Sequence, residues 1–305
     1  MRRFLLRRLG QAVLVVVGVS LVVFFVIRLS GDPIYLLLPP TATEADRARL
    51  AGELRLDRPL WVQYAVFAKR GLTGDLGRSL RYGQAALPLV LERLPATLEL
   101  ALAALIVSLV VSIPAGIVAA VRRHTAYDNL TMLGALFGQS MPVFWLGIML
   151  ILVFSVRLEL FPTSGRGGLE HLVLPALTLG LYSTARVTRL VRAGMLDVMG
   201  QEYIRTAWAK GLPGRRVIGK HALRNTLVPV VTIVGLELGS LLGGAVITET
   251  IFAWPGVGRL AVTAIFQRDY PVVQAAVLVT ALVFVACNLL VDLAYGWLDP
   301  RIRYD

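Results

Sequence analysis

Long runs of apolar residues are the feature that most constrains what this chain can fold into. A helix that crosses the hydrocarbon core of a membrane needs about 20 predominantly apolar residues. Residues 9–27 form such a run, in which Gln11 is the one strongly polar side chain. Of the 305 residues, 56% are hydrophobic and 16% are charged, far from the fractions typical of soluble domains. The sequence therefore predicts an integral membrane protein of the all-α class.

Six segments are long and apolar enough to be predicted as membrane spans. They are residues 9–27, 96–121, 130–156, 172–193, 228–252 and 271–298. Pro114, Pro142 and Pro229 lie within or at the ends of these segments. Because neighbouring helices can satisfy the carbonyl groups that proline frees, we expect these prolines to mark kinks or helix ends and not breaks in a span.

The first run follows a basic segment, as the apolar part of a signal peptide does. It is longer than the apolar region of a signal peptide, and it ends without a cleavage site of the small-x-small type. We therefore predict a retained helix, and six spans place both termini on the same side of the membrane.

Lysine and arginine residues predict that this side is the cytoplasm. The side that holds the amino terminus would carry 17 of them: four in residues 1–8, two at 122–123, nine in 186–224 and two at 301–303. The two short outer loops would carry four, Arg157, Arg166, Arg259 and Arg268. This bias favours a cytoplasmic amino terminus. Residues 29–95 hold nine basic and seven acidic residues, and a loop of that length crosses the membrane largely regardless of charge, so we predict it to be extracytoplasmic.

The formal net charge of +12 does not indicate a nucleic-acid partner, because arginines beside the membrane set topology and contact anionic lipid head groups. No soluble basic face with aromatic platforms is apparent.

His124, His171 and His221 are far apart in sequence and lack the spacing of a metal site. Cys287 lies within an apolar run, where we expect a small apolar filler. Phosphate-binding and hydrolase motifs are absent from the sequence, so we predict no catalytic residue, metal or cofactor.

Four acidic residues lie inside or at the ends of the predicted spans: Glu99, Glu237, Glu249 and Asp292. Such residues mark a transport pathway or a paired site, because an isolated charge in the membrane is costly. For the three near span ends, we favour a hydrogen-bonded partner in a neighbouring helix or contact with water. Glu237 lies near the middle of the fifth span, and for this residue both interpretations stay open.

Glycines at four-residue spacing recur in two spans. Gly235, Gly239 and Gly243, with the adjacent Gly244, lie in the fifth span, and Gly134 and Gly138 lie in the third. This spacing puts small residues on one helix face, so we expect close helix packing there.

A polar, basic stretch at residues 202–229, EYIRTAWAKGLPGRRVIGKHALRNTLVP, separates the fourth and fifth runs. Its pattern R-T-A-x-A-K-G-L at 205–212, followed by H-A-L-R-N-x-L-V-P at 221–229, resembles the EAA loop of ABC-transporter permeases of the dipeptide, oligopeptide and nickel branch. Other blocks typical of that family follow in its order along the whole chain. They are R-R-L near the start of the first span, G-D-P at 31–33, G-D-L-G-R-S at 74–79, L-P-A-T-L-E-L at 94–100, S-M-P-V-F-W-L-G at 140–147, F-P-T-S-G at 161–165, E-T-I-F-A-W-P-G-V-G at 249–258, R-D-Y-P-V-V-Q at 268–274 and L-D-P-R-I-R at 298–303.

The resemblance implies a multi-pass permease subunit of the cytoplasmic (inner) membrane with the type I ABC importer permease fold. Its parts would be an N-terminal transmembrane helix in residues 1–28, an extracytoplasmic loop region in 29–95, and a five-helix permease core in 96–305 with a cytoplasmic coupling loop in 194–227. The implied partners are a second homologous permease, two ABC ATPase subunits that themselves bind ATP and magnesium, an extracytoplasmic solute-binding protein and membrane lipids. The implied substrates are di- or oligopeptides. Nickel chelates and glutathione stay open, since the separate binding protein makes most of the selection.

In this family the loop carries the helix that docks on the ATPase. The expected ATPase-coupling residues are Arg205, Thr206, Ala207, Trp208, Ala209, Lys210, Gly211 and Leu212. Arg205 replaces the glutamate that names the motif and Thr206 replaces its first alanine, as is usual in the peptide branch. Trp208 stands where a polar or basic residue is more typical, and it would pack either into a partner's groove or against the membrane-proximal helices.

The residue types also predict the shape of this loop. We expect a short helix over 205–209, a close approach or a left-handed turn at Gly211, and an end to the helix before Pro213. The alternative is a solvated basic loop that binds anionic lipid.

Trp254, Pro255 and Gly256 interrupt the fifth span, and polar residues at 267–269 forbid burial in lipid. We predict a short outer helix or a re-entrant hairpin over 252–270 that lines an external gate, and a simple connecting loop is the alternative. The candidate pathway or gate residues are Glu237, Glu249, Trp254, Pro255 and Gly256.

Two other classes of membrane protein fit less well. A secondary transporter would show inverted repeats with broken helices and carboxylates at the bilayer centre, and no internal repeat is apparent. An intramembrane enzyme would need paired catalytic groups at depth, and the sequence shows no such pair.

Overall fold

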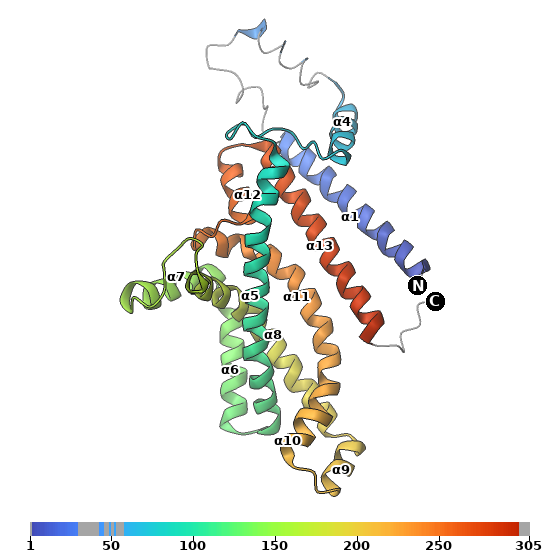
Figure 1. The fold of residues 1–305 in the computed structure, drawn as a ribbon, viewed down its shortest axis with the longest axis vertical. Coiled ribbons are helices and arrows are strands. Elements are labelled where there is room, and N and C mark those ends of the chain that lie inside the picture. The colour runs from blue at the N-terminus through green and yellow to red at the C-terminus, as the bar shows by residue number, and fades with distance from the viewer. Residues whose placement is uncertain (1, 30–42, 46–48, 50–51, 53–57, 299–305) are drawn as a thin grey trace. The chain divides into compact units, whose positions relative to one another are not determined.

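The computed structural model describes residues 2–29, 43–45, 49, 52 and 58–298. This described part is helical, and its one β-bridge, between Arg78 and Ala85, is isolated. The G-D-P block at 31–33 and the end of the chain after Leu298 lie outside the described residues. Figure 1 labels most of the helices along the chain. The chain divides into two compact units, one of residues 1–95, 256–286 and 304–305, and the other of 96–255 and 287–303.

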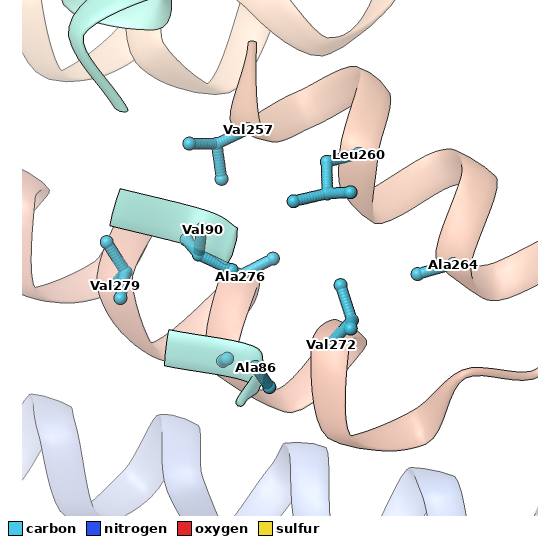
Figure 2. Packing of buried hydrophobic residues seen from close by; sticks show 9 residues of the cluster. Ala86, Val90, Val257, Leu260, Ala264, Val272, Ala276 and Val279 are labelled. Atoms are coloured by element: carbon cyan, nitrogen blue, oxygen red, sulfur yellow. The ribbon is translucent and has the colours of Figure 1, made fainter. Parts of the chain in front are cut away.

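The first unit contains α1 (Arg2–Leu29), α4 (Leu60–Leu72), the start of α5 (Ala86–Val121), α12 (Val257–Phe266) and most of α13 (Tyr270–Leu298). Its core is built from small and branched apolar side chains. They are Ala86, Val90, Val257, Leu260, Ala264, Val272, Ala275, Ala276 and Val279 (Figure 2). The valines and alanines let the start of α5 approach α12 and α13 closely, because small side chains keep helix backbones near each other.

A buried carboxylate fixes the loop between α4 and α5. Asp269 is 1% exposed, and it accepts hydrogen bonds from the Ser79 hydroxyl, from the Leu80 amide at 3.2 Å and from the Arg81 amide at 3.3 Å. The G-D-L-G-R-S and R-D-Y-P blocks of the sequence therefore meet at one site.

The second unit contains the rest of α5, then α6 (Ala126–Ser140), α7 (Val143–Leu150), the wider π-helical turn η1 (Ile151–Arg157) and α8 (Leu169–Met199). The short α9 (Glu202–Ala209), α10 (Gly214–Arg216) and η2 (Val217–Ala222) follow, and then α11 (Leu223–Ile251). Helix α8 packs against both α6 and α11, and α7 packs against α8 and α11.

Glycines permit further close contacts, of α8 with α5 and of α11 with α13, but not all the glycines predicted to pack closely do so. A Cβ atom on Gly180 would lie 2.5 Å from the Ala104 carbonyl oxygen, and one on Gly235 would lie 2.3 Å from Val291. Gly134 and Gly243 face open space instead, with nothing within 4 Å of an added Cβ. The expectation of packing is therefore correct for Gly235 and wrong for Gly134 and Gly243 within this chain.

Four helical segments are long and apolar enough to cross a membrane: Arg8–Arg28, Ala86–Val121, Pro229–Ile251 and Tyr270–Asp292. A fifth arises if α6 and the following helix Val143–Arg157 form one broken span. Pro114 and Pro229 lie inside unbroken helices, as predicted. Helix α5 begins at Ala86, earlier than the predicted span at 96, because Pro95 is accommodated within it.

The third predicted span, 130–156, is not one continuous helix. Helices α6 and α7 meet at a bend of 103° around Ser140–Pro142. Pro142 therefore lies at a helix end, as expected, but the expectation of an unbroken span there is wrong. Proline has no backbone N–H, and it disfavours helical geometry in the preceding residue. Met141 accordingly has an extended conformation, with φ −74° and ψ 131°.

The fourth predicted span, 172–193, lies within one helix, α8, but this helix is not among the candidate spans by composition. It carries Arg186, Arg189 and Arg192 in addition to its apolar residues. The described part of the chain thus has four or five candidate spans by length and composition.

Candidate functional site

The predicted coupling loop forms a compact helical knob, the segment of residues 202–222 that consists of α9, α10 and η2. Helix α9 covers the predicted 205–209 and begins three residues earlier, at Glu202. Lys210 follows it, and its amide donates to the Thr206 carbonyl oxygen at 3.1 Å. Pro213 precedes α10 in an extended conformation, so it separates the two short helices as expected.

Apolar contacts attach the knob to the long helices. Ile204 and Ala207 of α9 are 1% and 6% exposed. They belong to one hydrophobic cluster with Val217 and Ala222 of η2 and with α5, α8 and α11, which contribute Ala120, Val187, Val191, Met195 and Val230. Asn225 of α11 also donates a hydrogen bond from Nδ2 to the Tyr203 hydroxyl at 2.7 Å. The knob is therefore a packed extension of α8 and α11.

The eight predicted coupling residues divide into an outer and an inner set. The outer set is exposed and comprises Arg205, Thr206, Trp208, Ala209, Lys210 and Gly211. Ala207 points inward, into the cluster, and Leu212 is half-buried against the same cluster. A docking partner would therefore meet the outer set, while Ala207 and Leu212 hold α9 in place.

Gly211 has φ +72°, which is the left-handed turn that the sequence predicts. Its amide donates to the Trp208 carbonyl oxygen at 2.9 Å. An added Cβ would meet nothing within 4 Å, so the backbone conformation requires glycine here and crowding within the chain does not. The Trp208 ring lies over Gly214, with an atom 3.3 Å from a Cβ built there, and the residue remains 50% exposed.

Glu237, the carboxylate near the middle of α11, is 1% exposed and has a charged partner on α8. Arg186 donates from Nη1 to Glu237 Oε1 at 2.7 Å, and the Ser240 hydroxyl lies 3.3 Å from Oε2. Its partner is more accessible, since the Arg186 side chain is 49% exposed. Glu237 is thus a paired carboxylate, and its role in a pathway stays a prediction.

Glu249 and Trp254 come together at the end of α11. Both are buried, and the Trp254 amide donates to the Glu249 carbonyl oxygen at 2.9 Å. The Thr97 hydroxyl of α5 donates to Glu249 Oε1 at 2.6 Å, and the Trp254 indole donates from Nε1 to the Ala96 carbonyl oxygen at 2.8 Å. Glu237 is not part of this group, because it lies 12 positions before Glu249, which is about 18 Å along the helix.

An arginine that the sequence suggested only as a marker of topology also belongs to this group. Arg166 forms an ion pair with Glu99 at 2.6 Å, and its guanidinium lies 5.9 Å from the centre of the Trp254 ring. Glu99 is thereby paired, as we expected. The predicted loop after Trp254 contains the helix α12, so the expectation of a short helix in 252–270 is confirmed in its conformation, and Gly256 is the residue before its first turn.

Sequence reasoning missed a second buried ion pair in the same unit. Arg192 of α8 donates from Nε and Nη2 to both carboxylate oxygens of Asp128 in α6, at 2.6 and 2.7 Å. Between Arg186 and Arg192, Arg189 donates to Gln139 of α6 at 2.5 Å. The signal was the spacing of three arginines, three residues apart, inside a segment predicted to span.

The comparisons with known proteins cover the whole chain. Residues 112–304 match the family described as binding-protein-dependent transport system inner membrane component, and residues 1–101 match its N-terminal region. The dipeptide transport system permease protein DppB of Escherichia coli K12 is 42% identical, with 100% of this chain and 99% of that protein covered. The oligopeptide transport system permease protein AppB of Bacillus subtilis 168 is 40% identical, with both chains covered in full. The glutathione transport system permease protein GsiC of Escherichia coli O6:H1 is also 40% identical over both complete chains.

Solved structures show the same fold at low sequence identity. An inward-facing MetNI methionine ABC transporter matches with a TM-score of 0.58 and 18% identity, covering 69% of this chain and 96% of that chain. A second crystal form of the same transporter gives a TM-score of 0.54 at 20% identity, covering 68% of this chain and 94% of that chain.

Proposed function

Because this chain belongs to the family of binding-protein-dependent transport system inner membrane components, we propose that it forms half of the translocation pathway of an ATP-driven peptide importer. It is a non-catalytic, multi-pass protein of the inner membrane, and it works with ATPase and solute-binding partners. We propose a second, homologous permease as the other half of the pathway. Two ATPase subunits would bind ATP and magnesium and carry out the hydrolysis.

The single observation that carries the coupling role is the attachment of the knob. Its buried face joins α8 and α11, while Arg205, Trp208 and Lys210 on its outer face are exposed. A partner that binds the outer face in two different ways in its nucleotide-bound and nucleotide-free states would shift the equilibrium of the attached helices, by as much as its affinities for those states differ. The knob would transmit this shift as a rigid body, because Ile204 and Ala207 anchor it.

The proposed topology has six spans, with both termini and the knob in the cytoplasm and residues 29–95 outside. The count of lysine and arginine supports this orientation even without the three arginines of α8. In the six-span proposal, the broken pair α6 and α7 supplies one span and α8 supplies another, with its arginines turned to protein partners and not to lipid.

We propose that the group at the end of α11 belongs to an external gate. Glu249, Trp254, Pro255 and Gly256 lie where the helix stops, and Trp254 is hydrogen-bonded to α5. A gate requires contacts between helices that move relative to each other. Here the end of α11 is connected to α5 by two buried hydrogen bonds, Thr97 to Glu249 and Trp254 to Ala96.

Di- or oligopeptides are the proposed substrates, because relatives with full coverage at 40–42% identity are named for dipeptide and oligopeptide transport. Glutathione, a tripeptide, remains the alternative on the same ground, and a nickel chelate is a further one from the sequence pattern. The binding protein that delivers the substrate would distinguish these possibilities.

The test is purification of a tagged copy of this chain, identification of the subunits that accompany it, and reconstitution of the complex in proteoliposomes with its binding protein. We expect uptake of labelled dipeptide that requires both ATP and the binding protein. Uptake without ATP would contradict an ABC importer, and ATP-dependent uptake of a nickel chelate but of no peptide would contradict the proposed substrate.

A further inference from the structure

The Arg186–Glu237 pair places an arginine head group deep within the apolar part of the chain. Glu237 lies about 12 Å along the helix axis from Pro229 and about 21 Å from Ile251 at 1.5 Å per residue, the two ends of the candidate span. Arg186 contacts Glu237 at 2.7 Å, so its guanidinium reaches the same depth. A charge at this depth that faced lipid would be costly, and such residues face a water-filled cavity or a protein partner instead.

The surface around Arg186 differs from the other exposed surfaces of this unit. On α8, Tyr182 lies one turn before Arg186 and is 39% exposed. On α11, Ser240 and Gly243 are exposed and lie one and two turns after Glu237, between the apolar Leu236 and Ile247. By contrast, the exposed residues of α5 include Leu102, Ile106 and Val110 on one apolar face, as expected for a helix in contact with lipid. The lining of ligand sites also combines apolar residues with a few placed polar groups, so the composition of this surface is compatible with a pathway wall.

The chemistry of the pair limits what it can bind. Arg186 uses Nη1 for Glu237, and among the described residues Nε and Nη2 have no partner. These two groups form one edge of the guanidinium fork, which matches both oxygens of a carboxylate. Glu237 is 1% exposed, so it is not accessible to a passing ammonium group. The exposed side of this pair therefore presents the hydrogen-bond donors of Arg186, which favour a negatively charged ligand group.

We propose that Arg186 lines the translocation pathway and binds the carboxylate of a passing peptide, with Glu237 as its fixed counter-ion. This inference rests on the proposed function and adds to it a ligand group and a residue. The counter-ion makes the pair neutral overall, so a carboxylate is held by hydrogen bonds without a full unpaired charge. Weak binding of this kind suits transport, in which the ligand must leave again.

The inference is tested by accessibility of a cysteine beside the pair. Gly243 is exposed and has nothing within 4 Å of an added Cβ, and Cys287 is the one native cysteine. The chain with Cys287→Ser and Gly243→Cys is assembled into the full complex, and its labelling by a hydrophilic maleimide is followed by mass spectrometry in the nucleotide-free and ATP-trapped states. Alanylalanine and its C-terminal amide serve as the protecting probes.

We expect labelling in at least one state, slowed by alanylalanine and not by the amide. Arg186→Gln should raise the peptide concentration needed for protection by about tenfold or more, the usual effect of losing a hydrogen bond to a charged group. Because that variant leaves Glu237 buried without its partner, the double variant Arg186→Gln, Glu237→Gln is tested beside it, and the same loss of protection is expected.

Three outcomes would overturn the inference. The first is no labelling in either state, which would mean that lipid or protein covers this face. The second is equal protection by the amide, and the third is unchanged protection in the double variant. Uptake of alanylalanine by the unsubstituted complex is measured in parallel, so a failure of peptide import itself, which would remove the basis of the inference, is recognised separately from a failure of the Arg186 assignment.

Discussion

At the scale of single residues, two ion pairs inside the second unit join one helix to another. Arg186 and Glu237 join α8 to α11, and Arg192 and Asp128 join α8 to α6. A buried charge is costly unless it is paired and hydrogen-bonded, so each pair favours one arrangement of its two helices. The sequence predicted that Glu237 would be either paired or part of a pathway, but it did not indicate its partner, which is 51 positions away.

The Asp128–Arg192 pair provides a test of this account through stability. Asp128→Asn removes the charge that Arg192 binds with two hydrogen bonds and leaves a mostly buried guanidinium without its counter-ion. We expect a destabilisation on the order of 3 kcal/mol, seen as a lower thermal unfolding midpoint of the solubilised complex. Glu202→Gln is the matched control, because its pair with Arg205 is exposed and should contribute less than about 1 kcal/mol. Equal midpoints for the two variants would show that the Asp128–Arg192 pair contributes no more to stability than the exposed Glu202–Arg205 pair.

At the scale of elements, the sequence predicted those features that local chemistry decides. The short helix before Gly211, the left-handed turn at Gly211 and the separation at Pro213 each follow from the residue types. The 103° bend at Pro142 was not predicted. A proline shows that a helix is interrupted, but the size of the bend depends on the packing of α7 against α8 and α11, and no local pattern contains that information.

The inward orientation of Ala207 was another feature that the motif alone did not reveal. Ala207→Leu should overfill the cluster around Val217 and Met195 and cost about 1–3 kcal/mol. Ala209→Leu makes the same change on the exposed side of α9, where we expect almost no effect on stability. Hydrogen exchange of α9 and the unfolding midpoint of the complex compare the two variants. Similar losses for both would mean that α9 is not anchored through Ala207.

At the scale of the whole molecule, composition was enough to predict an all-helical membrane protein, and the order of the motifs predicted its family. The number of spans was harder to predict, because α8 combines apolar residues with three arginines. Hydropathy alone does not decide whether such a helix spans the membrane, because Arg186 and Arg192 are paired with carboxylates of other helices and Arg189 donates to the amide oxygen of Gln139. Which faces of the chain would contact the proposed second permease is likewise a property of the assembly.

The proposed topology predicts opposite labelling of two positions in a chain that carries Cys287→Ser. In the loop between α4 and α5, Ser79 is buried against Asp269, whereas Tyr82 is 48% exposed, so Tyr82 is the position chosen for the probe. A membrane-impermeant maleimide added to intact cells, which reaches the extracytoplasmic side, should label Tyr82→Cys and should label Arg215→Cys only after the membrane is opened. The reverse labelling pattern would show that the topology is opposite to the proposed one.

The central claim is that the knob couples ATP hydrolysis to transport, and Gly211 tests it most directly. Gly211→Arg forces a bulky side chain into a left-handed conformation, at a cost of about 1–2 kcal/mol, on the outer face of the knob. Gly211→Asn is the control, since asparagine tolerates this conformation, and Lys210→Ala removes only an exposed charge.

The measurement is ATP-driven dipeptide uptake by the reconstituted complex, together with its ATPase activity and subunit composition. We predict that Gly211→Arg reaches the membrane with its partner permease but loses uptake, while both controls retain most of it. Uptake by Gly211→Arg at the wild-type rate would contradict the assignment of this loop as the ATPase dock.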